Sequence, residues 1–87
     1  MNMRSVNDSK IKRIISNIRN IRETKGYSQF YLATKLGISQ NAYSKIELGY
    51  SSVTLDRFLK IAEILETDII DLLNLESKQP VRLKAVD

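Results

Sequence analysis

The sequence predicts an all-α domain built from five short helices. Apolar residues recur every three or four positions in five separate stretches, which is the spacing that gives a helix one buried face. Serine, threonine or aspartate residues precede these stretches, and glycines follow three of them. Capping residues at the starts and glycines at the ends therefore divide the chain into helices joined by short turns.

The first helix is expected to run from about Lys10 to Thr24 and to end at Gly26. Residues 1–9 are expected to form a flexible N-terminal arm that ends in a capping residue, Asp8 or Ser9. The apolar positions of this helix have a period near 3.6 and predict one buried face. They are Ile11, Ile14, Ile15, Ile18 and Ile21.

The second helix is expected over about Gln29–Leu36 and the third over about Gln40–Leu48. Ser28 and Ser39 precede them, and each hydroxyl can accept a hydrogen bond from a free backbone N–H. Gly37 stands where the second helix must end, at the position that favours a left-handed backbone. A helix, a short glycine turn and another helix form the geometry that places the second of the two in the DNA major groove.

The fourth helix is expected over about Leu55–Glu66, with Thr54 as its cap. The fifth is short, at about Ile69–Leu75, with Asp68 as its cap and Asp71 near its positive end. Residues 76–87 leave the helical pattern because they contain a proline. We therefore divide the chain into the arm (1–9), a helical DNA-binding domain (10–75) and a C-terminal tail (76–87), which is either disordered or ordered by a partner.

The composition excludes several classes of site. The chain has no cysteine and no histidine, so disulfides and thiolate or imidazole metal sites are absent from it. It has no glycine-rich phosphate loop and no convergent carboxylate pair, so we expect no catalytic residue, no metal and no cofactor. No apolar run approaches the roughly 20 residues of a membrane span. We expect a cytoplasmic protein associated with the nucleoid and not with a membrane.

The charge is unevenly distributed along the chain. The net charge is +4. Residues 1–45 hold nine Lys and Arg against two Asp and Glu, whereas residues 46–87 hold five against eight. The basic half contains the expected helix–turn–helix. This asymmetry favours an anionic partner such as the DNA phosphate backbone.

The segment from Ser28 to Gly49 resembles the Cro/repressor-type (lambda-repressor-like) helix-turn-helix family, and the likeness extends over roughly Lys10–Leu73. The matching residues are Gln29, Ala33, Gly37, Ser39, Ser44, Ile46, Glu47 and Gly49. The resemblance implies a compact five-helix DNA-binding domain in which the second and third helices form the helix–turn–helix. The chain departs from the family where Glu66 replaces a frequent glycine and where the loop after Gly49 lacks basic residues.

The resemblance implies two sets of DNA-contacting residues. The base-reading residues are Gln40, Asn41, Ser44 and Lys45 on the third helix, where amide side chains can bond adenine bidentately. The phosphate-contacting residues are Ser28, Gln29, Tyr43, Ser51 and Ser52. The Tyr43 ring is expected to pack into the core with its hydroxyl reaching the rim, and the phosphate contact of that hydroxyl is the alternative to a purely internal role. Gln29 is also expected to brace Gln40. The alternative for the glutamines is that they are ordinary polar residues facing solvent.

The resemblance also implies an ion pair between Arg22 and Glu47 that orients the recognition helix. At the other end of the domain, the fifth helix is too short to bury all its apolar residues. Ile70, Leu73 and Leu75 are therefore expected to form a homodimer interface. The alternative is that Leu72 and Leu73 pack inward and leave Ile70 alone at the surface.

These features predict a sequence-specific regulator of transcription that binds double-stranded DNA. The expected protein is a repressor that binds a near-palindromic operator as a homodimer. The alternative is an antitoxin-type interaction module, in which the tail binds a partner protein and the domain autoregulates its own promoter. An enzyme is the third class considered, and the sequence does not favour it.

Overall fold

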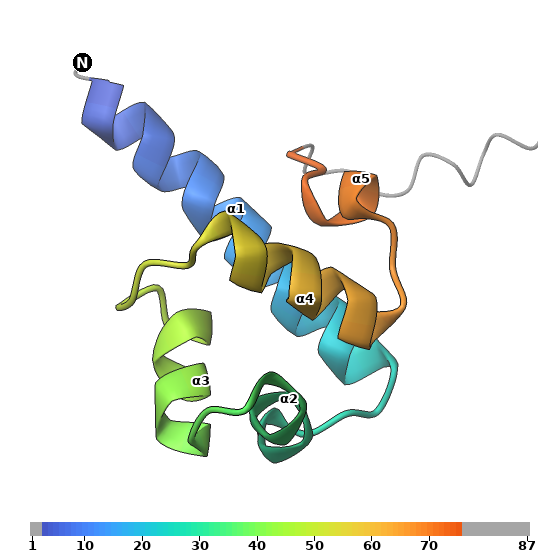
Figure 1. Ribbon diagram of the computed structural model, residues 1–87. Helices are drawn as coiled ribbons and strands as arrows, with labels where there is room; N and C mark the ends of the chain where they lie inside the picture. The colour runs from blue at the N-terminus through green and yellow to red at the C-terminus, as the bar shows by residue number, and fades with distance from the viewer. Residues whose placement is uncertain (1–2, 76–87) are drawn as a thin grey trace, which may run out of the picture.

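The structure is a computed structural model that describes the backbone of residues 3–75 and the side chains of residues 8–75. The described chain forms five α-helices and no strand, which confirms the predicted all-α class (Figure 1). The helices are α1 (Met3–Thr24), α2 (Gln29–Leu36), α3 (Gln40–Glu47), α4 (Leu55–Leu65) and α5 (Ile69–Leu72). The predicted C-terminal tail lies outside the described residues.

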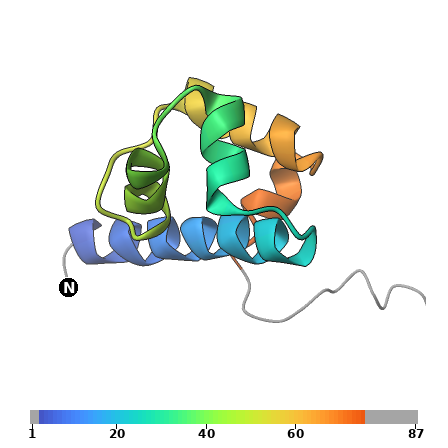
Figure 2. The ribbon, with the colours of Figure 1, turned by 90° about the horizontal axis from the view of Figure 1, so that it is seen from below.

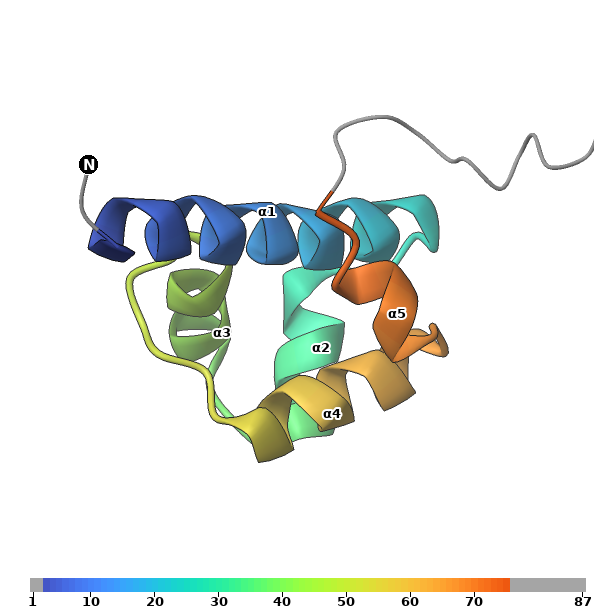
Figure 3. The same ribbon diagram turned by 90° about the horizontal axis from the view of Figure 1, so that it is seen from above.

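Helix α1 is the longest element and supports the rest of the domain. Figures 2 and 3 show it along one side of the molecule, with the other four helices on its opposite side. It begins at Met3, so the prediction of a flexible arm over residues 1–9 was wrong from Met3 onward. The segment between Met3 and Lys10 contains neither glycine nor proline, so nothing in it interrupts the helix.

The core lies between α1 and the four helices that cover it. All five helices contribute at least one buried apolar residue, so no helix is peripheral to the core. The buried cluster consists of Ile18, Leu32, Ala33, Tyr43, Ile46, Ile61, Ala62, Leu65 and Leu72. Burying these side chains supplies the main driving force for folding.

Three of the predicted helix caps are confirmed. The hydroxyls of Ser28, Ser39 and Thr54 each accept a hydrogen bond from a backbone N–H three residues later, at 3.0, 3.0 and 3.1 Å respectively. Two further cap predictions were wrong. Asp8 and Ser9 lie inside α1, which begins at Met3, and the side chain of Asp68 makes no capping hydrogen bond. Its backbone carbonyl instead accepts from the N–H groups of Asp71 and Leu72. Helix α5 therefore begins without a side-chain cap.

Asn17 on α1 forms hydrogen bonds to the end of α5. The Asn17 amide donates to the carbonyl oxygens of Leu72 and Asn74, at 2.9 and 2.8 Å. The Leu72 carbonyl is at the end of α5, where helical partners are lacking, and the Asn74 carbonyl lies just beyond the helix. The helix ends at Leu72, three residues earlier than predicted. Asn17 and the buried Leu72 thus both hold a helix that has only 4 residues.

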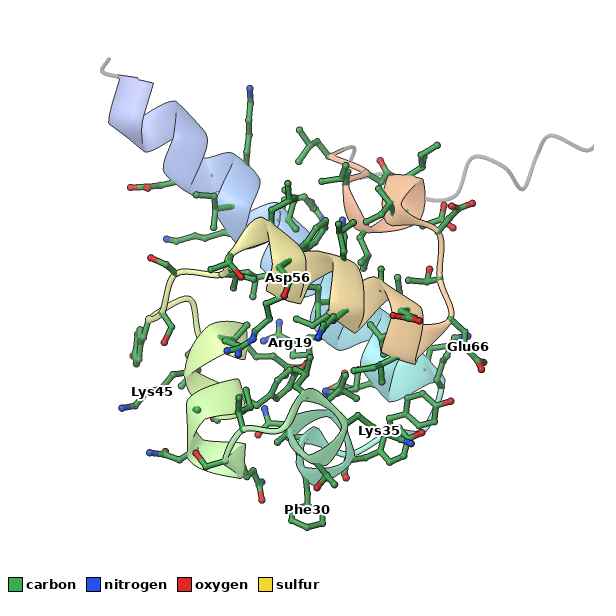
Figure 4. All side chains as sticks on the ribbon, in the orientation of Figure 1. Arg19, Phe30, Lys35, Lys45, Asp56 and Glu66 are labelled. Atoms are coloured by element: carbon green, nitrogen blue, oxygen red, sulfur yellow. The ribbon has the colours of Figure 1, made fainter. Side chains whose placement is uncertain are left out.

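Helix α4 ends in a left-handed residue that is not glycine. Glu66 has φ 54° and ψ 46°, and its N–H donates to the Glu63 carbonyl while that of Thr67 donates to Ala62. The turn therefore keeps the left-handed conformation that a glycine usually supplies, and it does so with a glutamate, so it is strained and not shaped differently. Figure 4 shows Glu66 at the end of α4, on the outside of the molecule.

Within the described part of the chain, no helix is both long enough and apolar enough to cross a membrane.

Replacing Glu66 with glycine is expected to stabilise the domain. A side chain in the left-handed region costs roughly 1 kcal/mol relative to glycine. Glu66→Gly should therefore raise the free energy of unfolding by about 0.5–1 kcal/mol in urea titrations. The control is Glu63→Gly, an exposed position inside α4, which should lower it by a similar amount. A loss of stability in Glu66→Gly would contradict the assignment of strain.

Candidate nucleic-acid interface

Helices α2 and α3 form a helix–turn–helix unit. Helix α2 ends at Gly37, which has φ 74° and leaves the helix in a left-handed conformation. The Ile38 N–H then donates to the Ala33 carbonyl at 3.0 Å, and Ser39 begins α3. Glycine is suited to this position because it carries no Cβ to oppose the left-handed backbone. In Figure 1 the two helices lie together at the lower side of the molecule.

Helix α3 has one buried face and one exposed face. Tyr43, Ile46 and Glu47 are buried. Gln40, Asn41 and Lys45 are exposed, as the base-reading prediction requires. Figure 4 shows Lys45 pointing outward from α3. Ser44, the fourth predicted base-reading residue, is half-buried, so it contributes less surface than the other three.

The buried face is organised around the carboxylate of Glu47. One oxygen, Oε2, accepts from Arg22 Nε at 2.7 Å and from the Tyr43 hydroxyl at 2.5 Å. The other, Oε1, accepts from an Arg22 terminal nitrogen and from Gln29 Nε2, each at 3.0 Å. The carboxylate therefore receives four donors, and the arginine contact is bidentate. This confirms the predicted ion pair between Arg22 and Glu47.

This network joins the three helices that surround it. Arg22 belongs to α1, Gln29 is the first residue of α2, and Tyr43 and Glu47 belong to α3. Arg22 also donates to the carbonyl of Tyr27 at 2.8 Å, which fixes the connection between α1 and α2. The buried carboxylate thus holds both halves of the helix–turn–helix against α1.

The network fixes the charge states of its members. Hydrogen bonding to Glu47 raises the pKa of Arg22. Burial opposes ionisation of Glu47, but the hydrogen bonds from Arg22, Tyr43 and Gln29 together lower its pKa. Burial and the bond to Glu47 raise the pKa of Tyr43. At neutral pH the site therefore contains a guanidinium, a carboxylate and a neutral phenol.

The structure corrects the prediction that Tyr43 contacts phosphate. Its side chain is 0% exposed, and its hydroxyl donates to Glu47 inside the domain. The polar end of this buried ring requires a buried acceptor. Glu47 provides that acceptor, so the hydroxyl is directed away from the surface.

Gln29 has a different neighbour from the one predicted. Its side-chain amide is half-buried and bonds Glu47, whereas we expected it to brace Gln40. Neither the local pattern nor the family resemblance had indicated this contact, which joins residues 18 positions apart. A phosphate contact by Gln29 stays a prediction, and the N–H groups of the first turn of α2 are the donors best placed for it.

The other predicted residues differ in their exposure. Ser28 and Ser52 are exposed, and Ser51 is half-buried in the loop after α3. On α5 and just beyond it, Ile70, Leu73 and Leu75 are exposed. Leu72 is completely buried, as the alternative reading of α5 required, but Leu73 does not pack inward with it.

Comparison with known proteins identifies the family. Residues 18–72 match the family model described as helix-turn-helix. The chain belongs to the lambda-repressor/Cro-like helix-turn-helix family. This family consists of DNA-binding domains of transcription regulators. The match spans all of α2 to α5 and the end of α1 that carries Arg22. No solved structure matched the chain significantly.

Relatives of this helix-turn-helix chain are named as transcription regulators. It is 52% identical over 52 residues to a protein of Picrophilus torridus named provisionally as an HTH-type transcriptional regulatory protein. The aligned segment is 60% of this chain and 16% of that protein. A similarly named protein of Thermoplasma acidophilum is 41% identical over 54 residues, 62% of this chain and 17% of the relative. The HTH-type transcriptional regulator AnsR of Bacillus subtilis is 26% identical over 73 residues, 84% and 63% of the two chains. The chain thus spans about one sixth of the first two relatives.

Removing Arg22 is expected to destabilise the domain most strongly at neutral pH. Arg22→Met leaves a buried carboxylate without its counter-ion, which costs about 3–5 kcal/mol. In the wild type the lowered pKa of Glu47 means that its contribution is present above the ordinary value of 4.5 and is lost as the pH falls. In the variant burial raises that pKa, so stability is gained as the pH falls. The difference between the two proteins should shrink between pH 7 and pH 4.

Urea titrations at both pH values measure this difference. Arg19→Met is the matched control, since Arg19 lies on the same helix and is exposed. We expect it to change the free energy of unfolding by less than about 0.5 kcal/mol. An Arg22→Met effect of the same size at pH 7 and pH 4 would show that Glu47 is not the group responsible.

Proposed function

We propose that this chain is a sequence-specific DNA-binding regulator of transcription whose α3 enters the major groove. The observation that carries the proposal is the division of α3 into two faces. Its buried face is fixed by the Glu47 network, and its exposed face presents Gln40, Asn41 and Lys45. A hydrogen-bonding surface on a rigidly held helix is what direct readout of base edges requires.

The proposed base contacts follow from the chemistry of the exposed side chains. Gln40 and Asn41 begin α3, the end of a recognition helix that enters the groove first. Each amide can bond N6 and N7 of adenine bidentately. Lys45, one turn further on, reaches either guanine or a phosphate. Ser44 is small and lets the backbone approach the DNA.

The proposed phosphate contacts lie at the start of α2 and in the loop after α3. Ser28 and the backbone N–H groups of Gln29 and its neighbour form a positive helix end that attracts phosphate. Ser51 and Ser52 offer hydroxyl donors on the other side of α3. Residues 1–45 carry the excess of positive charge, which supports binding of this half to DNA.

We further propose that the protein binds a near-palindromic operator as a homodimer and represses by blocking polymerase. Ile70 is 73% and Leu73 44% exposed, on a helix that Asn17 holds in place. An apolar groove of about 750 Å³ continues from Leu73 between α1 and α4, with Ile11 and Leu59 in its walls. A stable dimer buries roughly 800 Å² per subunit, so the proposed interface combines this groove with the exposed apolar side chains of α5 and with further surface around them. Two copies of α3 would then lie about 34 Å apart.

Removing both amides from the start of α3 is expected to abolish sequence preference. The operator is first defined by selecting bound duplexes from a random pool at about 150 mM salt, which screens phosphate attraction. Gln40→Ala with Asn41→Ala should then weaken binding to that duplex by about 30-fold or more, because each of the two contacts contributes roughly 1–3 kcal/mol. Binding to an unrelated duplex should stay within about twofold.

Lys60→Ala on the exposed side of α4 is the control for this experiment and should bind both duplexes as the wild type does. Equal losses on both duplexes in the double variant would remove Gln40 and Asn41 from base reading. Failure of the wild type to enrich any sequence would count against the proposed function itself.

Placing a charge on α5 is expected to separate the dimer. Ile70→Asp introduces a carboxylate that would have to be desolvated at the proposed interface. Sedimentation equilibrium should shift toward the mass of the 87-residue monomer. Leu48→Asp, an equally simple change at an exposed leucine beyond α3, should leave the mass unchanged. An unchanged mass in Ile70→Asp would remove α5 from the interface.

A further inference from the structure

The first turn of α2 presents a large apolar side chain to solvent. Phe30 is the second residue of this helix and is 64% exposed. Figure 4 shows its ring pointing away from the rest of the molecule. Single exposed apolar residues are common on protein surfaces, so exposure alone assigns no role. The position of Phe30 within the helix–turn–helix is what makes it informative.

The neighbouring polar side chain is turned inward. Gln29 bonds Glu47 at the last residue of α3, so its amide is occupied inside the domain. The Ser28 hydroxyl accepts from the Tyr31 N–H as the helix cap. Of the side chains at the start of α2, Phe30 therefore projects furthest toward solvent, beside the backbone N–H groups proposed to hold a phosphate. In Figure 4 it points from α2 toward the lower side of the view, where α3 also lies.

The next aromatic residue of α2 behaves differently. The ring of Tyr31 lies 4.6 Å from that of Tyr27, and the Lys35 ammonium lies 5.6 Å from its centre. The Tyr31 ring thus makes its contacts within the domain. Among the described residues, Phe30 has no ring or cation contact of this kind. Its apolar surface is available to a molecule that approaches α2.

We propose that Phe30 is a further DNA-contacting residue that packs on an apolar group at the edge of the operator; this rests on the proposed function. A phenyl ring carries no hydrogen-bond donor, so it cannot bind a phosphate oxygen. The apolar groups that a duplex offers at this place are the C5-methyl of thymine and the carbons of deoxyribose. Phenylalanine is among the residues that contact the thymine methyl in major-groove readout. A contact with the thymine methyl makes Phe30 a specificity-determining residue. A contact with deoxyribose carbons adds affinity without sequence preference.

The test compares wild type and Phe30→Ala on the selected operator and on operators in which each thymine is replaced in turn by deoxyuridine. Phe30→Ala should weaken operator binding about tenfold, because a ring of this size loses its apolar contact. Phe30→Leu retains an apolar side chain and should recover most of that loss. Lys60→Ala on the exposed side of α4 is again the control and should bind like the wild type.

The deoxyuridine series distinguishes the two sources. If Phe30 contacts a thymine methyl, replacing that thymine with deoxyuridine weakens wild-type binding about fourfold. The same replacement leaves the binding of Phe30→Ala unchanged. With a sugar contact, Phe30→Ala loses affinity equally on every operator of the series and on unrelated duplexes.

The proposal is overturned if Phe30→Ala binds the operator as tightly as the wild type while the Gln40 and Asn41 double variant loses binding. That result leaves the proposed function intact. If the wild-type protein enriches no operator and binds no duplex, the proposed function fails and this inference fails with it. Circular dichroism of Phe30→Ala checks that the fold is kept, as expected for an exposed position where alanine favours the helix.

Discussion

The buried carboxylate of Glu47 is the constraint on which the recognition unit depends. A charge of this kind is tolerated in a small core only when donors surround it, and here Arg22, Tyr43 and Gln29 do so. The donors come from three helices. Satisfying one charge therefore sets the positions of α1, α2 and α3 together. A purely apolar contact would not impose the same geometry, because it has no preferred direction.

In this arrangement the 8 residues of α3 divide into a face that orients the helix and a face that is free to contact a partner. The inward face of α3 is committed to the carboxylate network, and the outward face keeps its side chains for a partner. Tyr43 illustrates the division, since its hydroxyl serves the interior although a phosphate contact was expected from its position in the helix. The same logic accounts for Gln29, whose amide stabilises Glu47 and leaves Phe30 as the outward side chain of the first turn.

Local signals predicted the fold well, and contacts between distant residues were the part that sequence could not supply. The Ser28, Ser39 and Thr54 caps act within one turn, so the residue type at the boundary was sufficient. The start of α1 was misplaced because the absence of helix breakers is a weaker signal than an apolar pattern. Of the candidate site, the Arg22 and Glu47 pair followed from family resemblance. The additional donors to Glu47 depend on how helices cross, which no single stretch of sequence encodes.

The two side-chain attachments on α1 have a mechanical consequence. Arg22 connects this helix to the recognition unit, and Asn17, little more than one turn earlier, connects it to α5. Helix α1 therefore connects the exposed face of α3 directly to the face proposed to meet a second copy. A displacement of one face relative to the other would have to move or bend this helix. A dimer built this way would tolerate little change in the separation of its half-sites, since one inserted base pair adds about 3.4 Å and also rotates one half-site about the DNA axis.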